Sequence, residues 1–302
     1  RTGTAAGVRL LEHPEVRAAA FTGSTPGGRA LFDIANRRPV PIPFYGELGS
    51  LNPVYVSREA MSARAAQLVS GFVDSYTLGA GQLCTKPGLV FVPKAEGFAA
   101  AALERVQGLP ATRLLNDRIA DSYTAVGDLL SAVAGVEVLS AGGATELGHA
   151  PALLATTIDT FLQNAETLTT ERFGPSALVV EYDDVAQLAA AADAVGGTLT
   201  STVHAEHVTD AGIADLLPAA VRQSGRIIWN GWPTGVTVSP AMMHGGPYPA
   251  ATSPLHTSVG LTAISRFLRP VVFQGFPDEA LPAELKEANP LGLARSVDIL
   301  RD

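Results

Sequence analysis

The sequence predicts an α/β protein built around a doubly wound, largely parallel sheet. Short apolar runs typical of buried strands alternate along the chain with longer segments whose apolar residues recur at helical spacing. Clusters of glycine and proline separate these segments, as expected of loops between regular elements. The chain has 302 residues, of which 47% are hydrophobic, which is enough to bury a sizeable core in one or two domains.

The first predicted elements are a helix, a strand, a glycine-bearing turn and a second helix. Residues 4–11 are predicted to be helical, residues 16–22 to form a buried strand, and residues 29–35 to form the second helix. The turn between strand and helix contains Gly23 and Ser24, and such a helix N-terminus favours a bound phosphate. Ser24 either caps the helix or donates to the phosphate, and an ordinary capped turn is the alternative.

The next elements lead to the only cysteine. Residues 39–43 are proline-rich and predicted to be extended, and they lead into a strand that ends at Glu47. A strand over residues 53–56 precedes a helix that Ser57 can cap and that ends near residue 78. Cys84 follows this helix in a glycine-rich loop, and residues 89–92 form another buried strand.

The rest of the chain continues the alternation and then becomes irregular. Helices are expected over 95–133 (with a break near Pro110), 185–194 and 210–223, and strands over 136–139, 153–158, 176–182, 199–204 and 226–229. Residues 233–254 are rich in glycine and proline and are predicted to form an irregular loop. Beyond them we expect a helix over 259–268, a strand over 271–273 and a tail helix over 282–289.

Because Cys84 is the only cysteine, it cannot form a disulfide within the chain, and it is either a packing thiol or a nucleophile. Glycines at 79, 81 and 88 surround it, and glycine lets a backbone take unusual angles and a substrate come close. A nucleophile needs such a turn, with backbone N–H groups free to hold an oxyanion. No spacing of potential ligands indicates a zinc or calcium site, so we expect no metal.

Four motifs, in this order along the chain, resemble those of the aldehyde dehydrogenase superfamily. Phe-Thr-Gly-Ser-Thr at 21–25 is similar to its cofactor loop, and Glu-Leu-Gly-Ser at 47–50 resembles its Glu-Leu-Gly-Gly segment. Gly-Gln-Leu-Cys-Thr at 81–85 resembles its nucleophile loop, and Glu-Arg-Phe-Gly-Pro at 171–175 its Glu-x-Phe-Gly-Pro clamp. The runs at 244–249 and 266–271 resemble one branch, which oxidises fatty aldehydes or semialdehydes such as 2-oxoglutarate semialdehyde (2,5-dioxovalerate), often with NADP.

The resemblance implies oxidation of an aldehyde to a carboxylic acid. Cys84 would attack the carbonyl to give a thiohemiacetal, a hydride would pass to NADP or NAD, and Glu47 would activate the water that hydrolyses the resulting thioester. A desolvated Glu47 would have a raised pKa suited to that role, whereas without the motif it would be a solvated or capping glutamate. His244 would assist the base or the thiolate, or else be a loop histidine bonded to backbone.

The remaining motif residues are assigned to the cofactor by the same resemblance. Gly23 and Ser24 would contact the pyrophosphate, Glu171 the nicotinamide ribose, and Phe173 would pack on the nicotinamide ring. The alternative for Glu171 and Phe173 is a strand-entry turn with a core phenylalanine. Arg172 departs from the apolar residue expected inside the clamp.

The resemblance also implies the domain organisation. Residues 1–47 would be the end of a Rossmann-like cofactor domain, residues 48–250 the catalytic domain, and residues 251–302 a return segment with an oligomerisation strand and a tail. The family's second oxyanion donor, an asparagine in a Pro-Trp-Asn segment, has no counterpart in this sequence. We therefore expect a fragment of a longer protein that is not a competent dehydrogenase by itself.

Two further readings stay open, namely a cofactor-free thiol hydrolase and a structural or binding unit that retains the fold. The formal net charge of −8 argues against nucleic acid or an anionic membrane as partner. The expected partners are a small aldehyde and further copies of the protein, as a dimer or tetramer. A single cysteine suits a reducing compartment, so a cytoplasmic protein is expected.

Overall fold

The computed structural model describes residues 4–94 and 97–296. The chain divides into two compact units, Arg1–Arg266 and Phe267–Asp302. Every residue singled out above for catalysis or cofactor binding lies in the first unit.

The N-terminal part forms a small parallel sheet with two helices. Its elements are α1 (Thr4–Glu12), β1 (Ala19–Thr22), α2 (Thr25–Arg37) and β2 (Phe44–Glu47). Proline in the first turn of α2 fixes a helical φ where no N–H bond is lost, so the helix starts directly after the turn. The register of β1 and β2 sets Thr22 beside Glu47, which brings the turn after β1 next to the end of β2.

A seven-stranded sheet forms the centre of the first unit, in the order β11-β10-β3-β4-β9-β8-β5. The strands are β3 (Val54–Val56), β4 (Leu89–Pro93), β5 (Glu137–Ala141), β8 (Ala152–Thr157), β9 (Ser176–Tyr182), β10 (Thr198–His204) and β11 (Ser224–Trp229). All neighbours run parallel except β5, which pairs antiparallel with β8 at one edge. The predicted doubly wound, largely parallel α/β fold is confirmed.

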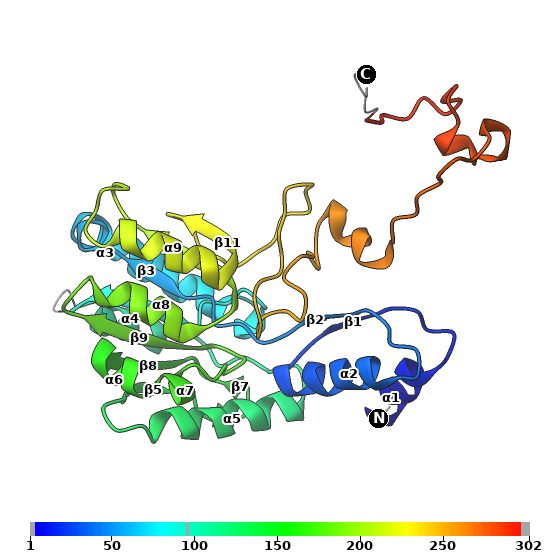
Figure 1. The fold of residues 1–302 in the computed structure, drawn as a ribbon. Helices are drawn as coiled ribbons and strands as arrows, with labels where there is room; N and C mark the ends of the chain where they lie inside the picture. Colours follow the sequence, from blue (N-terminus) through cyan, green and yellow to red (C-terminus); the bar gives the residue numbers. More distant parts are fainter. Residues whose placement is uncertain (1–3, 95–96, 297–302) are drawn as a thin grey trace. The chain divides into compact units, whose positions relative to one another are not determined.

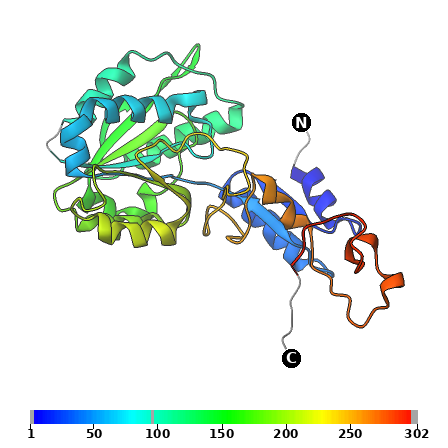
Figure 2. The same ribbon diagram turned by 90° about the horizontal axis from the view of Figure 1, so that it is seen from above.

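Helices cover both faces of this sheet, as Figures 1 and 2 show. One face carries α3 (Arg58–Thr77) and α4 (Phe98–Gln107), and the other carries α6 (Ile158–Gln163), α8 (Gln187–Val195) and α9 (Ile213–Gln223). Successive strand residues alternate between the two cores: Val54 and Val56 pack with Phe72 of α3, whereas Tyr55 faces the α8 and α9 side. Ser57 caps α3 by accepting from Ala60 N–H, as the sequence predicts.

Several elements differ from the sequence-based expectation. The segment expected to be helical from residue 95 gives α4 and, after the break, α5 (Asp117–Ser131), while residues 95 and 96 lie outside the described residues. The short helices α6 and α7 (Ala165–Leu168) and the hairpin of β6 (Ala144–Thr145) and β7 (Gly148–His149) were not predicted. Elements of two to six residues carry too little periodicity to be recognised in a sequence.

The expectations for the C-terminal segment are wrong within this single chain. Residues 259–268 form only the 3₁₀ helix Leu261–Phe267, residues 271–273 form no strand, and the tail helix reduces to the turn Ala283–Leu285. Prolines at 270, 277, 282 and 290 interrupt this segment, and most of its described side chains are exposed. A short helix with no packed apolar face is only marginally stable, so the expected helices are not stabilised in this segment.

Candidate active site

The loop that carries Cys84 has an unusual backbone. After α3, the three residues Gly79, Ala80 and Gly81 all take positive φ angles, of 59°, 58° and 62°. A Cβ on Gly81 would stand 2.2 Å from the carbonyl oxygen of Gly174, so the loop packs directly on that backbone. Cys84 follows on a turn and is partly exposed, as a nucleophile requires. In the described structure no acceptor takes the N–H of Cys84, which leaves it available to an oxyanion.

Asn52 holds this loop in place. Its side-chain N–H groups donate to the carbonyl oxygens of Cys84 and Lys86, each at 2.9 Å. Its Oδ1 accepts from the hydroxyls of Ser50 at 2.8 Å and Thr200 at 3.2 Å. Asn52 is fully buried, and of these bonds only the one to the Cys84 carbonyl oxygen is partly exposed. The sequence analysis missed this residue, although an asparagine before a proline at a strand entry was a usable signal.

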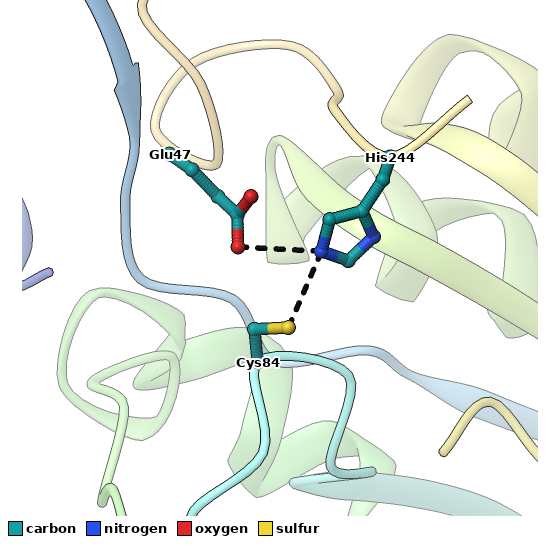
Figure 3. A group of neighbouring side chains, drawn as sticks. All are labelled: Glu47, Cys84 and His244. Carbon is teal, nitrogen blue, oxygen red and sulfur yellow. Dashed lines mark hydrogen bonds and ion pairs between the residues drawn. The ribbon is translucent and has the colours of Figure 1, made fainter. Parts of the chain in front are cut away.

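Cys84, His244 and Glu47 come together from three distant parts of the chain, as Figure 3 shows. The Sγ of Cys84 lies 3.2 Å from Nε2 of His244, and the same nitrogen lies 3.2 Å from Oε1 of Glu47. Glu47 ends β2, Cys84 follows α3, and His244 lies in the irregular loop after β11. The structure thus brings together the three side chains that the sequence analysis named as catalytic.

The hydroxyls of Thr257 and Ser258 hold His244 and Glu47 in place. The hydroxyl of Ser258 donates to Oε2 of Glu47 and lies 3.0 Å from the carbonyl oxygen of His244. The backbone N–H of His244 donates to Oγ1 of Thr257 at 2.8 Å. No signal in the sequence distinguished Thr257 or Ser258 from other loop hydroxyls, because their partners are far away along the chain.

Glu47 and His244 each favour the charged form of the other, and this shifts both pKa values. Burial disfavours the charged imidazole, but its hydrogen bonds to Cys84 and Glu47 and the carboxylate charge outweigh burial and raise the pKa of His244 to about 9. Burial alone would raise the pKa of Glu47, but hydrogen bonds from His244 and Ser258 and the charge of His244 hold it below its ordinary value. The raised pKa that we expected for Glu47 is therefore wrong, because its polar partners outweigh desolvation.

Gly23 and Ser24 form an exposed turn directly before α2. The backbone N–H of Gly23 donates to the carbonyl oxygen of Glu47 at 3.1 Å, which ties this turn to the strand that carries the candidate base. Ser24 occupies the N-cap position, but its side chain makes no capping hydrogen bond. The capping alternative for the Ser24 side chain is thus not what the structure shows, and the N-terminus of α2 is open to an anion.

Glu171 lies beside the turn at Gly23 and the start of α2. A Cβ on Gly49 would stand 2.6 Å from Oε2 of Glu171 and 3.0 Å from Oγ1 of Thr25, at the start of α2. The Ser50 backbone also hydrogen-bonds the Glu171 carboxylate. Burial raises the pKa of Glu171 to about 7, although the nearby Lys86 charge opposes this. The structure therefore places Glu171 close to the start of α2, where the sequence analysis put the phosphate contact.

The clamp segment is anchored by two buried cations. Lys86 donates to the carbonyl oxygens of Arg172 and Ser176, at 3.2 and 2.9 Å, and burial lowers the pKa of Lys86 to about 8. Arg172 donates to the carbonyl oxygen of Tyr123 at 2.8 Å and stacks over its ring. Arg172 is thus a buried anchor in place of the expected apolar residue. Phe173, next to it, is only partly buried.

The residues assigned to the cofactor fit a bound dinucleotide in their chemistry. The open N-terminus of α2 suits a phosphate, and a partly buried carboxylate on Glu171 suits ribose hydroxyls. A small cavity lies against Glu47 and His244 and is also lined by Tyr45, Ser253, His256 and Arg266. No helix in the described part of the chain has the length and apolar character needed to cross a membrane.

Comparison with known proteins gives a consistent result. A family model described as "Aldehyde dehydrogenase family" matches residues 1–248. Alpha-ketoglutaric semialdehyde dehydrogenase 2 of Azospirillum brasilense is 43% identical over 301 residues, which cover 98% of this chain and 57% of that protein. Alpha-ketoglutaric semialdehyde dehydrogenase of Acinetobacter baylyi is 40% identical over the same length and the same shares. The chain thus spans 57% of the length of these two curated relatives.

Solved structures agree at the level of the fold. A 3,6-anhydro-L-galactose dehydrogenase in complex with NAP superposes with a TM-score of 0.72 at 20% identity, over 87% of this chain and 55% of that chain. An aldehyde dehydrogenase from Bacillus cereus gives a TM-score of 0.70 at 17% identity, over 87% and 52% of the two chains.

Proposed function

Because the chain belongs to the aldehyde dehydrogenase family, we propose that its protein oxidises an aldehyde to a carboxylic acid through a covalent intermediate on Cys84. One observation carries the proposal: the only thiol of the chain lies 3.2 Å from an imidazole that is itself 3.2 Å from a buried carboxylate. A nucleophile and a base within reach of one substrate atom are what acyl chemistry on a cysteine needs.

Cys84 acts first, as the nucleophile. Protonated His244 places a hydrogen-bond donor against Sγ, and attack of the sulfur on the carbonyl carbon gives a thiohemiacetal oxyanion. The backbone N–H of Cys84 supplies one donor to that oxygen. When NADP⁺ or NAD⁺ is bound, it supplies the acceptor for the hydride that the substrate carbon loses.

Glu47 and His244 act in the second half, when water hydrolyses the thioester. Oε1 of Glu47 accepts a hydrogen bond from Nε2 of His244, so one proton lies between the two side chains. Acylation of Sγ removes the sulfur contact that helps to keep the proton on His244. The pair then takes the proton of the attacking water, and Ser258 keeps the carboxylate in position through Oε2.

Gly23, Ser24, Glu171 and Phe173 would hold the dinucleotide. The open N-terminus of α2 would bind its pyrophosphate, and Glu171 would accept from the nicotinamide ribose hydroxyls. Lys86 keeps the backbone around Glu171 fixed relative to the nucleophile loop, because it belongs to that loop and bonds the carbonyl oxygen of Arg172. Phe173 is partly exposed and would pack against the nicotinamide ring.

The substrate is a semialdehyde with a carboxylate at its other end, such as 2-oxoglutarate semialdehyde. Two relatives that are 43% and 40% identical are named for the α-ketoglutaric semialdehyde. The cavity beside Glu47 and His244 is lined by Arg266 and His256, which suit an anionic group. The protein is proposed to act in the cytoplasm as an oligomer.

A cofactor-free thiol hydrolase is the competing candidate, and the geometry disfavours it. In a hydrolase triad the acid holds the ring nitrogen that faces away from the nucleophile. Here Glu47 and Cys84 both contact Nε2 of His244, and in the described structure the buried Nδ1 has no hydrogen-bond partner. Glu47 therefore does not hold the His244 ring by the nitrogen opposite Cys84, as the acid of a hydrolase triad does.

The test follows nicotinamide reduction by the purified full-length protein with NADP⁺ or NAD⁺ and a panel of aldehydes and semialdehydes. Cys84→Ala should abolish acid formation, and Glu47→Gln should slow thioester hydrolysis while leaving a burst of reduced cofactor in single turnover. The matched control is Glu59→Gln, at the exposed start of α3, which should behave as wild type. Retained turnover in Cys84→Ala, or acid release from esters with no nicotinamide reduction for any aldehyde of the panel, would overturn the proposal.

A further inference from the structure

The geometry points to a regulatory role for the same three side chains: Cys84, His244 and Glu47 form a site for Zn²⁺ that inhibits the protein when the ion is bound. The inference rests on the side chains used in the proposed function, but the binding it describes needs neither aldehyde nor nicotinamide. One ligand atom from each residue lies within 4.8 Å of the other two. The sequence analysis expected no metal, because these residues are far apart along the chain.

The donor set is one that zinc prefers. Thiolate sulfur, imidazole nitrogen and carboxylate oxygen are the three kinds of zinc ligand found in proteins, whereas calcium and magnesium prefer oxygen alone. The ion displaces the proton of His244 Nε2 to solvent, and the thiolate and the carboxylate together balance its two positive charges. Glu47 and His244 are 7% and 2% exposed, so a bound ion would be shielded from water on their side.

Two of the three distances between ligand atoms are close to those of a tetrahedral centre, and the third, from sulfur to the carboxylate, is within 4.8 Å. Zinc bonds of roughly 2.3 Å to sulfur and roughly 2.0–2.1 Å to nitrogen or oxygen put neighbouring ligand atoms about 3.3–3.6 Å apart. The two contacts at His244 Nε2 are both 3.2 Å, so small outward shifts of the side chains would admit the ion. Cys84 is partly exposed, which leaves the fourth position to water.

The surroundings favour reversible binding over a permanent structural site. Zinc-bound histidines normally donate their second N–H to an acceptor, which raises affinity by about 10–100-fold. The buried Nδ1 of His244 has no such partner among the residues that the structure describes. Ser258 does hold the second oxygen of Glu47. An occupied site would remove the nucleophile and the base at once, so the ion inhibits.

The test uses metal alone, with no aldehyde and no nicotinamide. Co²⁺ titration of the protein should give a sulfur-to-cobalt charge-transfer band and the intense visible bands of a tetrahedral ion, and Zn²⁺ should displace both. Because Cys84 is the only cysteine, its reaction with a disulfide reagent such as DTNB reports this thiol alone. Zn²⁺ should slow that reaction at least ~10-fold, and EDTA should restore it.

His244→Ala and the closer-sized His244→Gln should each weaken Zn²⁺ protection of the thiol at least ~10-fold, since each removes a direct ligand. The matched control is His207→Ala, an exposed histidine outside the cluster, which should leave protection unchanged. Far-UV circular dichroism checks that each variant is folded.

Two results would overturn the site: no charge-transfer band with Co²⁺, or protection by Zn²⁺ that both folded His244 variants retain in full. Dehydrogenase activity without metal binding would reject this inference and leave the proposed function standing. Metal binding without dehydrogenase activity would support the zinc site and reject the proposed function.

Discussion

At the scale of single residues, the site depends on one nitrogen atom. Nε2 of His244 contacts both Cys84 and Glu47, and the pKa of its imidazole is raised to about 9. An imidazolium between a thiol and a carboxylate stabilises negative charge on either neighbour, which suits a residue used in both halves of the reaction. The backbone of His244 is held by two side-chain hydroxyls, because Thr257 accepts its N–H and Ser258 lies within hydrogen-bond distance of its carbonyl oxygen.

The His244–Glu47 pair should make stability depend on pH. The folded pKa of His244, about 9, lies above its ordinary value of 6.5, so its contribution is fully present below pH 6.5 and is lost as the pH rises through 9. Wild type should exceed His244→Gln in free energy of unfolding at pH 6.5, on the order of 1–3 kcal/mol. Urea denaturation between pH 6.5 and 10 measures this. A difference that stays constant with pH would contradict the prediction.

At the scale of the elements, the nucleophile loop is defined by what it packs on. Its left-handed turn brings Gly81 against the backbone of Gly174, and Asn52 bonds the carbonyl oxygens on both sides of Thr85. Lys86 continues the same loop and bonds the clamp segment. The nucleophile loop, the clamp and the start of β3 therefore form one hydrogen-bonded unit, and a change in any of them should move Cys84.

Two glycines of that loop form a matched pair. Both have positive φ, but a Cβ on Gly79 would make ordinary contacts of 3.6 Å with Leu83, whereas one on Gly81 would meet backbone at 2.2 Å. Gly79→Ala should cost roughly 1–2 kcal/mol of stability from the left-handed angle alone. Gly81→Ala should cost clearly more, because the loop must also separate from Gly174. Thermal or urea unfolding measures the stability of the two variants. Equal losses of stability would show that the contact between Gly81 and Gly174 is not close.

Asn52 offers a second test of the same unit. Asn52→Ala would leave the carbonyl oxygens of Cys84 and Lys86 without their donor, at a cost of about 1–3 kcal/mol for the buried one of Lys86 and less for the partly buried one of Cys84. Stability should fall, and the rate at which iodoacetamide alkylates Cys84 should change because the loop is released. Asn36→Ala, which loses only an exposed bond to its own helix, is the control and should alter neither. An unchanged alkylation rate in folded Asn52→Ala would show that the residue does not position the thiol.

At the scale of the whole molecule, the two units differ in how their apolar residues are used. The first buries its large side chains on both faces of the seven-stranded sheet. In the second, Val271, Val272 and Phe273 are 56%, 86% and 40% exposed in the single chain. Exposed apolar residues in an extended segment are suited to pairing with another chain, so this segment stays the predicted contact between subunits.

Val272→Asp should therefore shift the protein toward smaller species. A charge at that position would have to be buried without a partner in a strand that pairs between subunits, which is strongly unfavourable. The control is Val208→Asp, because Val208 is also exposed, at 67%, but lies in the first unit before α9. Light scattering with size exclusion measures the mass. An unchanged mass for Val272→Asp would reject this segment as the interface.

Most of the first unit follows from local features of the sequence. Strands and helices there are set by local periodicity and by short-range signals such as the Ser57 cap, and the structure forms them close to the predicted residues. The motif resemblance also named Cys84, Glu47 and His244 as candidate catalytic residues, and it assigned Gly23, Ser24, Glu171 and Phe173 to the cofactor. In each case the information lies within a few neighbouring residues, so it can be read without the fold.

How these groups influence one another depends on the folded chain. The sequence predicted a raised pKa for Glu47, but its charge is set by His244 and Ser258, about two hundred residues away along the chain. Asn52 and Lys86 owe their roles to carbonyl oxygens that loops bring to them. The helix and strand expected beyond residue 258 had local propensity but no surface to pack on. Electrostatics and burial depend on distances in space, and these are fixed only when the chain has folded.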